Sequence, residues 1–449
     1  MAIALGLCMI ALGTTSILLA QDDRDTAMLR RNSAASLLTS DSAIAEILTI
    51  FSDPSNARLL GKNYDPIHPK TGTHYLGSDG IPNSGDEDST AVNEWQIPDP
   101  ACLSSLGVGT PTLSLTQTLN PQSSYRLLAY RYHPNTQSGH ILVEGIHNNI
   151  PSQVYVNLSI KHDSREFPGI SVHQSAYWQG RRLTGHNSNF YFHPQASAST
   201  GLSGKATPTA ANRADYLDGI WSGPSDNLNL DSIEGNLVAC AATSSLSYSP
   251  QGTTLGTIST SRSLAGNPDS VTHYQADRIE LSDSEVLEVD TTAGPVYLYV
   301  NGVTELRGNA KIRNVRTDGA LPRVGDFRLL QVATETAPLV LYDTTCIQDA
   351  FIYSPEVDVH LLTTGDGCPG PGNSSIQGVL WAEDIENSTD SASVRPYDRD
   401  GAPNLVTSGV TTGIEVPENV SSLVDLLEAV NLPVFYKITG VNAWNKVRL

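Results

Sequence analysis

The chain has 449 residues, a net charge of −20 at pH 7 and only 16% charged residues. A chain of this length is too long to fold around one ordinary hydrophobic core, so several units or one elongated β unit are expected. An acidic chain repels phosphate backbones, and we therefore expect no nucleic-acid partner. The 36 glycines and 26 prolines favour a turn-rich, mainly β structure.

An uncharged apolar segment comes first. Residues 2–20 have the sequence AIALGLCMIALGTTSILLA, and about 20 such residues in a helix cross the hydrocarbon core of a membrane. A cleaved signal peptide is the alternative, but it would need a preceding basic segment and a small-x-small cleavage site. Lipidation at Cys8 is disfavoured, because Leu7 stands where a small residue is required.

The next segment, residues 21–52, contains no Pro or Gly and has a helical period. One apolar face is formed by Leu37, Ile44, Leu48 and Phe51. Asp41 interrupts that face. Because nothing breaks the helix between the two segments, residues 2–52 are predicted to form one helix of roughly 75 Å.

This arrangement resembles the N-terminus of type IV pilins. An apolar span, a polar junction at 21–24 and an Ala/Ser/Leu-rich helix ending near AIAEIL are most similar to PilX-type pilus-assembly proteins, which are minor pilin-like subunits. The resemblance implies that the apolar half anchors the subunit in the inner membrane and later packs inside a fibre. The second half of the helix would then lie against the folded domain.

The sequence departs from the pilin pattern in two ways. The basic leader is missing, as is the acidic residue that major pilins carry five places into the apolar segment. We expect a start upstream of Met1. A basic leader there would also explain why Arg24, Arg30 and Arg31 follow the span on its outer side, against the positive-inside rule.

Residues 53–124 are predicted to be a loop-rich connector. Within it, Ser78–Asp88 (SDGIPNSGDED) resembles a calcium loop, as does Asp398–Asn404 (DRDGAPN) near the other end of the chain. Neither has the twelve-residue spacing that ends in Glu, and the same residues are ordinary turn formers. Plain turns are therefore the preferred interpretation, and calcium binding is left open.

Strand patterns dominate residues 125–390. Short strands and turn residues recur every 8–12 positions, which fits a sandwich, a barrel or a solenoid. We predict a right-handed parallel β-solenoid. The phrases LYVNGVTELRGNAKIRNV and AFIYSPEVDVHLL resemble rungs in the large surface domains of some PilX-like proteins. Residues 391–449 are then predicted to be a linker, a short helix beginning at Pro417 and a final strand that caps the solenoid.

Four cysteines follow the apolar segment, and none forms a C-x-x-C pair, so a zinc site is poorly supported. Cys346 and Cys368 are separated by about one solenoid coil, which would place them on neighbouring rungs at disulfide distance. Cys102 and Cys240 would be the remaining pair. Unpaired buried thiols stay the alternative.

Catalytic motifs are not evident, and we expect neither a cofactor nor a metal. HExxH, GxSxG and GxGxxG are absent, and Gly201–Thr207 departs from the P-loop spacing. Enzymes with a β-helix line a groove with carboxylates, and six aspartates could supply one: Asp277, Asp283, Asp290, Asp349, Asp358 and Asp384. Four aromatic residues could stack on sugars: Tyr177, Trp178, Trp221 and Trp381. Exposed charge and packed rings are the commoner explanations.

The sequence as a whole predicts a structural minor pilin-like or pseudopilin subunit and not an enzyme. It would be a single-pass inner-membrane protein with an extracytoplasmic β domain, incorporated in a surface pilus or involved in its assembly. Its expected partners are other pilin-like subunits and membrane lipid, with extracellular polysaccharide as a further candidate. Two alternatives remain, a membrane-tethered β-helix enzyme acting on polysaccharide and an anchored adhesin independent of pili.

Overall fold

The structure is a computed structural model, and it divides into two compact units. Unit 1 comprises residues 1–99, 109–163 and 435–449, and unit 2 comprises residues 100–108 and 164–434. The described residues are 2–96, 100, 102–103, 106–163, 167–176, 181–185, 188–192, 237–240, 246–332, 337–363, 367–369, 374–386, 412–416, 420 and 423–447.

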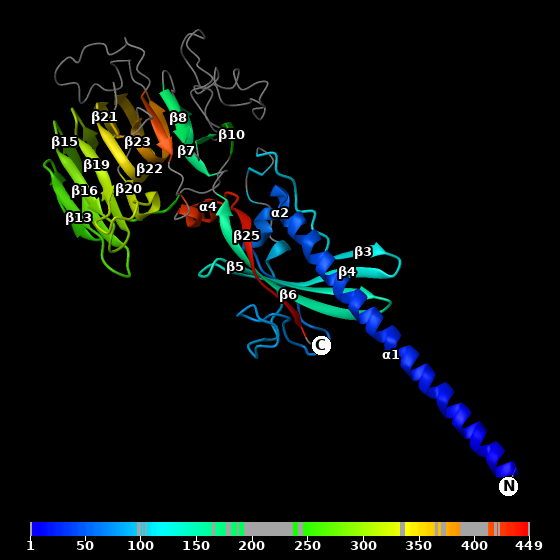
Figure 1. Cartoon of the computed structure of the whole chain (residues 1–449). Coiled ribbons are helices and arrows are strands. Elements are labelled where there is room, and N and C mark those ends of the chain that lie inside the picture. The colour runs from blue at the N-terminus through cyan, green and yellow to red at the C-terminus, as the bar shows by residue number, and fades with distance from the viewer. Residues whose placement is uncertain are drawn as a thin grey trace. The chain divides into compact units, whose positions relative to one another are not determined.

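Unit 1 begins with one long helix, α1 (Ala2–Phe51), which confirms the predicted continuous helix (Figure 1). Asp53 caps the N-terminus of α2 (Pro54–Ala57), because its carboxylate accepts a hydrogen bond from the Ser55 amide. Two short 3₁₀ turns follow, Arg58–Gly61 and Glu94–Gln96.

An antiparallel sheet completes unit 1, in the order β2-β1-β4-β5-β6-β25, with β3 paired to β4. Its strands are β1 (Tyr64–Asp65), β2 (Val92–Asn93), β3 (Thr116–Asn120), β4 (Ser123–His133), β5 (Ser138–His147), β6 (Ile150–Asp163) and β25 (Phe435–Val447). The β5–β6 turn is a two-residue hairpin, and Asn148 and Asn149 both adopt the positive φ that such a turn requires.

The final strand differs from its prediction. We expected the end of the chain to cap the solenoid, but β25 pairs with β6 along its whole length, from Phe435 beside Asp163 to Val447 beside Gln153. The predicted connector 53–124 likewise contains β1, β2 and β3. An alternating sequence shows that a strand exists but does not specify its neighbour, so the partner of this strand could not be identified from the pattern.

Unit 2 is built of parallel strands coiled into a β-helix, as Figure 1 shows for the green-to-yellow segments. Its mainly parallel β architecture confirms the predicted fold class, while the right hand of the coil stays a prediction. The strands are β7 (Pro168–Ala176), β8 (Arg181–Gly185), β9 (Asn189–Phe192), β10 (Leu237–Ala239), β11 (Thr253–Thr254), β12 (Thr257–Ile258), β13 (Arg262–Ala265), β14 (Thr272–Ala276), β15 (Arg278–Leu281), β16 (Val286–Asp290), β17 (Val296–Val300), β18 (Thr304–Leu306), β19 (Lys311–Val315), β20 (Phe327–Gln331), β21 (Leu339–Asp343), β22 (Cys346–Thr363), β23 (Ser374–Glu386) and β24 (Thr412–Val416).

From β11 to β19 each strand pairs with the strand three positions later, so three strands make one coil. Leu287 of β16, for example, pairs with Arg262 of β13 on one side and with Ile312 of β19 on the other. Alternate residues of the strands point into the coil, and the inward residues of β17 and β20 are completely buried. Stacking the same apolar positions in successive coils creates one continuous core.

The first strands of unit 2 lie beside its last coil. β7 pairs with β23 and β8 pairs with β24, although these strands are separated by most of the unit's sequence. After β10 the chain therefore passes to the coil furthest from β7, and each later coil lies nearer to β7. Both ends of the 164–434 segment consequently lie close together, as the pairing of Asp163 with Phe435 requires. Unit 2 is an insertion between two neighbouring strands of unit 1.

A short helix, α4 (Val424–Ala429), follows β24, and a 3₁₀ turn (Val324–Asp326) precedes β20. The predicted helix began at Pro417, which lies outside the described residues, as do residues 387–411 of the linker predicted at 387–415; the rest of that linker lies in β24. The buried face of α4 includes Leu426 and Leu427, and both belong to the core of unit 2.

Candidate functional site

The N-terminal helix α1 changes character along its length. In its first half the described apolar side chains face solvent, and Ile17, for example, is 61% exposed. In its second half Ala43, Ile44 and Ile47 are completely buried. Within the described residues, α1 is the one helix long and apolar enough to cross a membrane by length and composition. It is therefore compatible with a single-pass anchor.

Small residues bring the buried half of α1 close to the sheet of unit 1. Ser36 and Ser40 stand one helical turn apart, and their hydroxyls lie 2.6 Å from the Ser152 Oγ and 2.8 Å from the Ser152 carbonyl oxygen. The Gly145 amide donates to the Ser40 hydroxyl at 2.9 Å. A Cβ at Gly145 would lie 2.4 Å from the Ser40 amide, so only glycine permits this approach.

The polar residue that interrupts the apolar face of α1 has a partner from the other end of the sequence. The carboxylate of Asp41 accepts a hydrogen bond from the Trp444 Nε1 at 2.9 Å. Trp444 belongs to β25, the edge strand of the sheet. The interruption is thus a contact between the helix and the last strand, which the helical pattern alone could not reveal.

The acidic loop at 78–88 is closed by its own hydrogen bonds. The Asp86 carboxylate accepts from the hydroxyls of Ser78 and Ser84, both at 2.6 Å, and from the Asp79 amide at 2.8 Å. Slight burial opposes ionisation of Asp86, but these hydrogen bonds outweigh it and lower its pKa to about 2. Among the described residues, no group of three His, Cys, Asp or Glu side chains is placed to hold a metal ion.

A buried ion pair holds one end of this loop. The Asp65 carboxylate accepts from the Arg131 Nε at 2.9 Å and from the amides of Tyr75 and Leu76. His74 lies between this pair and the loop, with its Nε2 2.6 Å from the Asp88 carboxylate. The loop is therefore tied to the sheet at β1 and β4, which indicates a structural role for these charges.

Two histidines lie beneath the same loop. Gly80, which has a φ of 71°, brings the loop backbone against the rings of His133 and His140. The His140 Nδ1 is 2.6 Å from the Tyr155 hydroxyl, and its Nε2 is 3.0 Å from the Ser138 hydroxyl. Burial lowers the pKa of His140 to about 4, and the neighbouring His133 adds to this effect.

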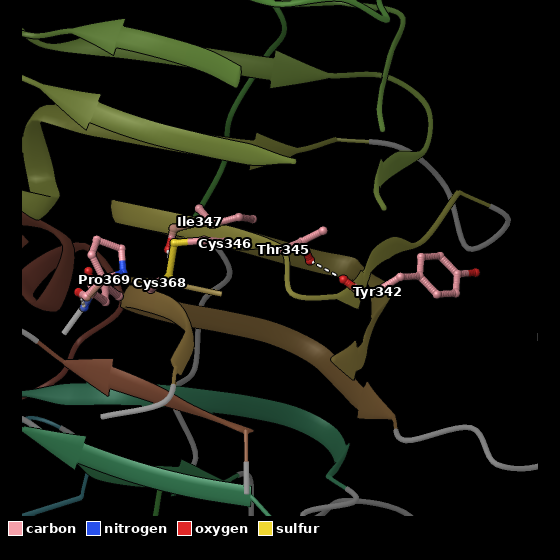
Figure 2. Close-up of a disulfide and its surroundings, with 7 residues drawn as sticks. Tyr342, Thr345, Cys346, Ile347, Cys368 and Pro369 are labelled. Atoms are coloured by element: carbon pink, nitrogen blue, oxygen red, sulfur yellow. Dashed lines mark hydrogen bonds between the residues drawn. A yellow bond between two sulfur atoms is a disulfide. The ribbon is translucent and has the colours of Figure 1, made fainter. Parts of the chain in front are cut away.

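Both cysteine pairs expected from the sequence are joined in unit 2. Figure 2 shows the bond between Cys346, at the start of β22, and Cys368, whose Cα atoms are 4.9 Å apart. Beside it, the Thr345 hydroxyl donates to the Tyr342 carbonyl at 2.7 Å. The second bond joins Cys102 to Cys240, with a Cα separation of 5.0 Å. It fixes the 100–108 segment to unit 2.

The six candidate aspartates do not form one cluster, although one pair of them lies on neighbouring strands. Asp349 lies in β22, and its carbonyl accepts a hydrogen bond from the Asn314 Nδ2. Asp277 and Asp283 stand in successive turns on either side of β15, and Asp290 ends β16, so three different corners of the coil are involved. Asp358 and Asp384 occupy paired backbone positions on β22 and β23. Of the aromatic candidates, Trp381 lies on β23, while Tyr177, Trp178 and Trp221 lie outside the described residues, as do Gly201–Thr207 and Asp398–Asn404.

Sequence reasoning missed the contacts that hold α1 to its sheet. The available signal was the pair of small residues at Ser36 and Ser40, because such spacing on a helix face favours close backbone approach. It also missed a cavity in unit 2 whose walls include Tyr248, Tyr353 and Trp381. No sequence period could have found it, since its walls come from separate coils and a connecting segment.

In unit 1 a long apolar N-terminal helix packs its second half along an antiparallel sheet, as the sequence led us to expect. Among solved structures, the chain is similar to the competence-associated pilin ComZ from Thermus thermophilus. The identity is 9%, with 93% of this chain and 98% of that chain covered, and the TM-score is 0.21. No family model matches the chain. No curated protein matches it.

Proposed function

We propose that this protein is a minor pilin-like or pseudopilin subunit of the PilX type. The first half of α1 holds it in the inner membrane, and unit 2 is displayed outside the cytoplasm. One observation carries the proposal: α1 is unbroken from Ala2 to Phe51, yet its described apolar side chains are exposed in the first half, whereas one face of the second half, with Ile44 and Ile47, is completely buried.

The exposed half needs an apolar environment that the described parts of its own chain do not supply. Leu12, Ile17, Leu18 and Leu19 are each at least 60% exposed. Covering such side chains is worth roughly 25 cal/mol per Å² of apolar surface. Lipid supplies that cover before assembly, and the helices of other pilin-like subunits supply it within a fibre. Both partners therefore use the same surface at different times.

A structural role agrees better with unit 2 than a catalytic one. A β-helix hydrolase or lyase of polysaccharide needs carboxylates that face one groove on adjacent rungs. Of the six candidate aspartates, Asp277, Asp283 and Asp290 occupy three different corners of the coil, and only Asp358 and Asp384 hold paired backbone positions on adjacent strands. We infer a binding or spacing role for the displayed unit. An anchored adhesin that never enters a fibre would have the same arrangement. Experiment is needed to distinguish it from a pilin-like subunit.

The test is a double substitution in the exposed half of α1, Leu12→Asp with Ile17→Asp. Each aspartate costs about 3 kcal/mol at the centre of a membrane helix, so the variant should be released from membranes by carbonate. Site-specific crosslinking from α1 to other pilin-like subunits should also be lost. Ala45→Asp is the matched control, because Ala45 is an exposed position in the packed half of the same helix.

Three results separate the candidate functions. Retention of the parent protein together with crosslinks to pilin-like subunits supports the proposal. Retention without any such crosslink favours the independent adhesin. Carbonate release of the unsubstituted protein, or a mature N-terminus beyond Ala20, would contradict the anchor itself.

A further inference from the structure

One outer face of the coil is unusually aromatic. On the sheet formed by β14, β17, β20, β22, β23 and β7, inward residues alternate with outward ones, and the outward positions include Tyr299, Tyr353 and Trp381. Paired positions place Trp381 beside Tyr353 on one coil and beside Ser171 on the other. An outward row of this kind would ordinarily be polar.

This aromatic face is covered by other parts of unit 2. Trp381 is only 5% exposed and Tyr353 only 6%. Tyr248, from the segment that precedes β11, packs edge-on against Tyr353 with ring centroids 5.6 Å apart. Asp425 of α4 reaches the same face, where its carboxylate accepts a hydrogen bond from the Arg328 Nη2 at 3.3 Å. The cover therefore consists of one extended segment and one short helix.

The cover is incomplete and leaves a cavity of about 470 Å³. Tyr248, Tyr353 and Trp381 form its aromatic walls, while Ser171, Ser247 and Glu356 contribute hydroxyl and carboxylate groups. Glu356 is exposed, and it has no ion-pair partner among the described residues. Cavities of roughly 300–1,000 Å³ that combine apolar walls with a few polar groups are typical of small-molecule sites.

The rings are held rigidly because their polar atoms are already used. The Trp381 Nε1 donates to the Pro168 carbonyl, and the Tyr353 hydroxyl donates to the Leu246 carbonyl, both at 3.1 Å. Both donor hydrogens are therefore used, and these two side chains offer the cavity mainly carbon surface. A ligand would find its polar partners among other lining groups, which include the serine hydroxyls, His173 and the Glu356 carboxylate.

In the described part of the chain, few charged groups surround the cavity. The Arg328 guanidinium behind one wall donates to the Tyr248 hydroxyl at 3.1 Å, and its charge is balanced by the Asp425 carboxylate 3.3 Å away. The Glu356 carboxylate on the rim disfavours an anion. A neutral ligand with an apolar face and several hydroxyls matches a cavity with aromatic walls and few charged groups. A pyranose ring has this character, because its C–H groups pack on aromatic rings and its hydroxyls donate to carboxylate.

We propose that the cavity bounded by Tyr248, Tyr353, Trp381 and Glu356 is a binding site for a neutral saccharide unit. It would give the displayed unit a carbohydrate ligand, and it depends on neither membrane anchoring nor fibre assembly. The site binds without cleaving, because it presents one carboxylate where glycoside hydrolysis ordinarily uses two.

The full chain in detergent should be tested by saturation-transfer NMR and calorimetry against three probes. These are neutral gluco-, galacto- and manno-oligosaccharides, an oligogalacturonate, and choline. We expect binding of at least one neutral oligosaccharide and of neither charged probe. Glu356→Gln should weaken that binding at least about ten-fold, the usual effect of losing a hydrogen bond to a charged group. Ser171→Phe, which fills the cavity, should abolish it.

Glu280→Gln is the matched control, because Glu280 is exposed on β15 outside the cavity and should leave affinity unchanged. Hydrogen exchange in unit 2 should remain as in the parent for all three variants, which separates a lost site from a lost fold. The proposal is overturned if no neutral oligosaccharide binds, if only choline or the galacturonate binds, or if neither cavity variant changes the affinity.

Discussion

Unit 1 joins segments that are far apart in the sequence, whereas most coils of unit 2 stack segments that follow one another; the pairings of β7 with β23 and of β8 with β24 are the exceptions. In unit 1, Trp444 bonds Asp41 across 403 positions, and Asn442 bonds Asn157 across 285. In unit 2, Arg313 contacts Glu288 across only 25. The two units therefore respond differently to damage: a coil is supported by its neighbours in sequence, and the sheet of unit 1 by the opposite end of the chain.

Removal of a disulfide should cause the largest loss of stability among these predictions, and it tests whether damage to unit 2 stays within unit 2. The Cys102–Cys240 bond closes a separation of 138 residues and the Cys346–Cys368 bond one of 22. In the chain-entropy model they contribute about 5 and about 3 kcal/mol. Replacing the first pair by serine should therefore destabilise unit 2 more than replacing the second. Hydrogen exchange measured by mass spectrometry on the full chain gives both values.

The same measurement shows whether the damage stays within one unit. Protection in β4, β5 and β6 should be unchanged in both double variants, because neither bond involves unit 1. Equal losses from the two pairs, or loss of protection in β5, would mean that the entropic comparison is mistaken.

Two glycine substitutions, one in each unit, test whether the units are destabilised independently. The expected loss of stability is intermediate among these predictions. A Cβ at Gly145 would meet the backbone of α1, and a Cβ at Gly378 would lie 2.2 Å from the Ala350 carbonyl oxygen on the neighbouring coil. Each alanine substitution should cost about 3 kcal/mol, the upper range for overpacking against rigid atoms. Gly145→Ala should weaken only unit 1, and Gly378→Ala only unit 2. Segment-resolved hydrogen exchange measures both.

Gly109→Ala is the control for this pair, because nothing lies within 4 Å of a Cβ there. If either packed glycine lowered protection equally in both units, the units would be one cooperative body and the comparison would fail.

The smallest effect concerns pH and His140. The unfolded chain titrates this histidine at its ordinary pKa of roughly 6.5, whereas burial lowers the folded pKa to about 4. Between these values the unfolded state binds a proton that the folded state excludes. Unit 1 should therefore lose stability as pH falls from about 6.5 to about 4, and should gain it again as pH rises.

Unfolding of β5 followed by hydrogen exchange at pH 7 and pH 4.5 measures this slope. His140→Gln, which keeps a hydrogen-bonding side chain beside Tyr155, should flatten it. An unchanged slope in the variant would assign the acid sensitivity to other groups. Asp86 is not among them, since its lowered pKa of about 2 gives it a more acidic window.

The sequence predicted what depends on local period. Apolar continuity predicted α1, and recurring short strands predicted the coil in which Leu287 stacks beside Ile312. It could not place β25, because a strand pattern does not identify a partner hundreds of residues away. For the same reason Asp41 was interpreted as a flaw in the helix face, although it is the acceptor for Trp444.

The insertion of unit 2 between β6 and β25 also delays the synthesis of β25 relative to that of its partner β6. Thr439 contacts Ser159 across 280 positions, so a ribosome adding 5–20 residues per second needs roughly 15–55 seconds to supply the partner of β6. Throughout that interval the nascent sheet presents an open strand edge to its surroundings, the kind of edge that recruits other chains. The arrival time of the last strand, more than the equilibrium fold, then sets how long that edge of β6 stays unpaired.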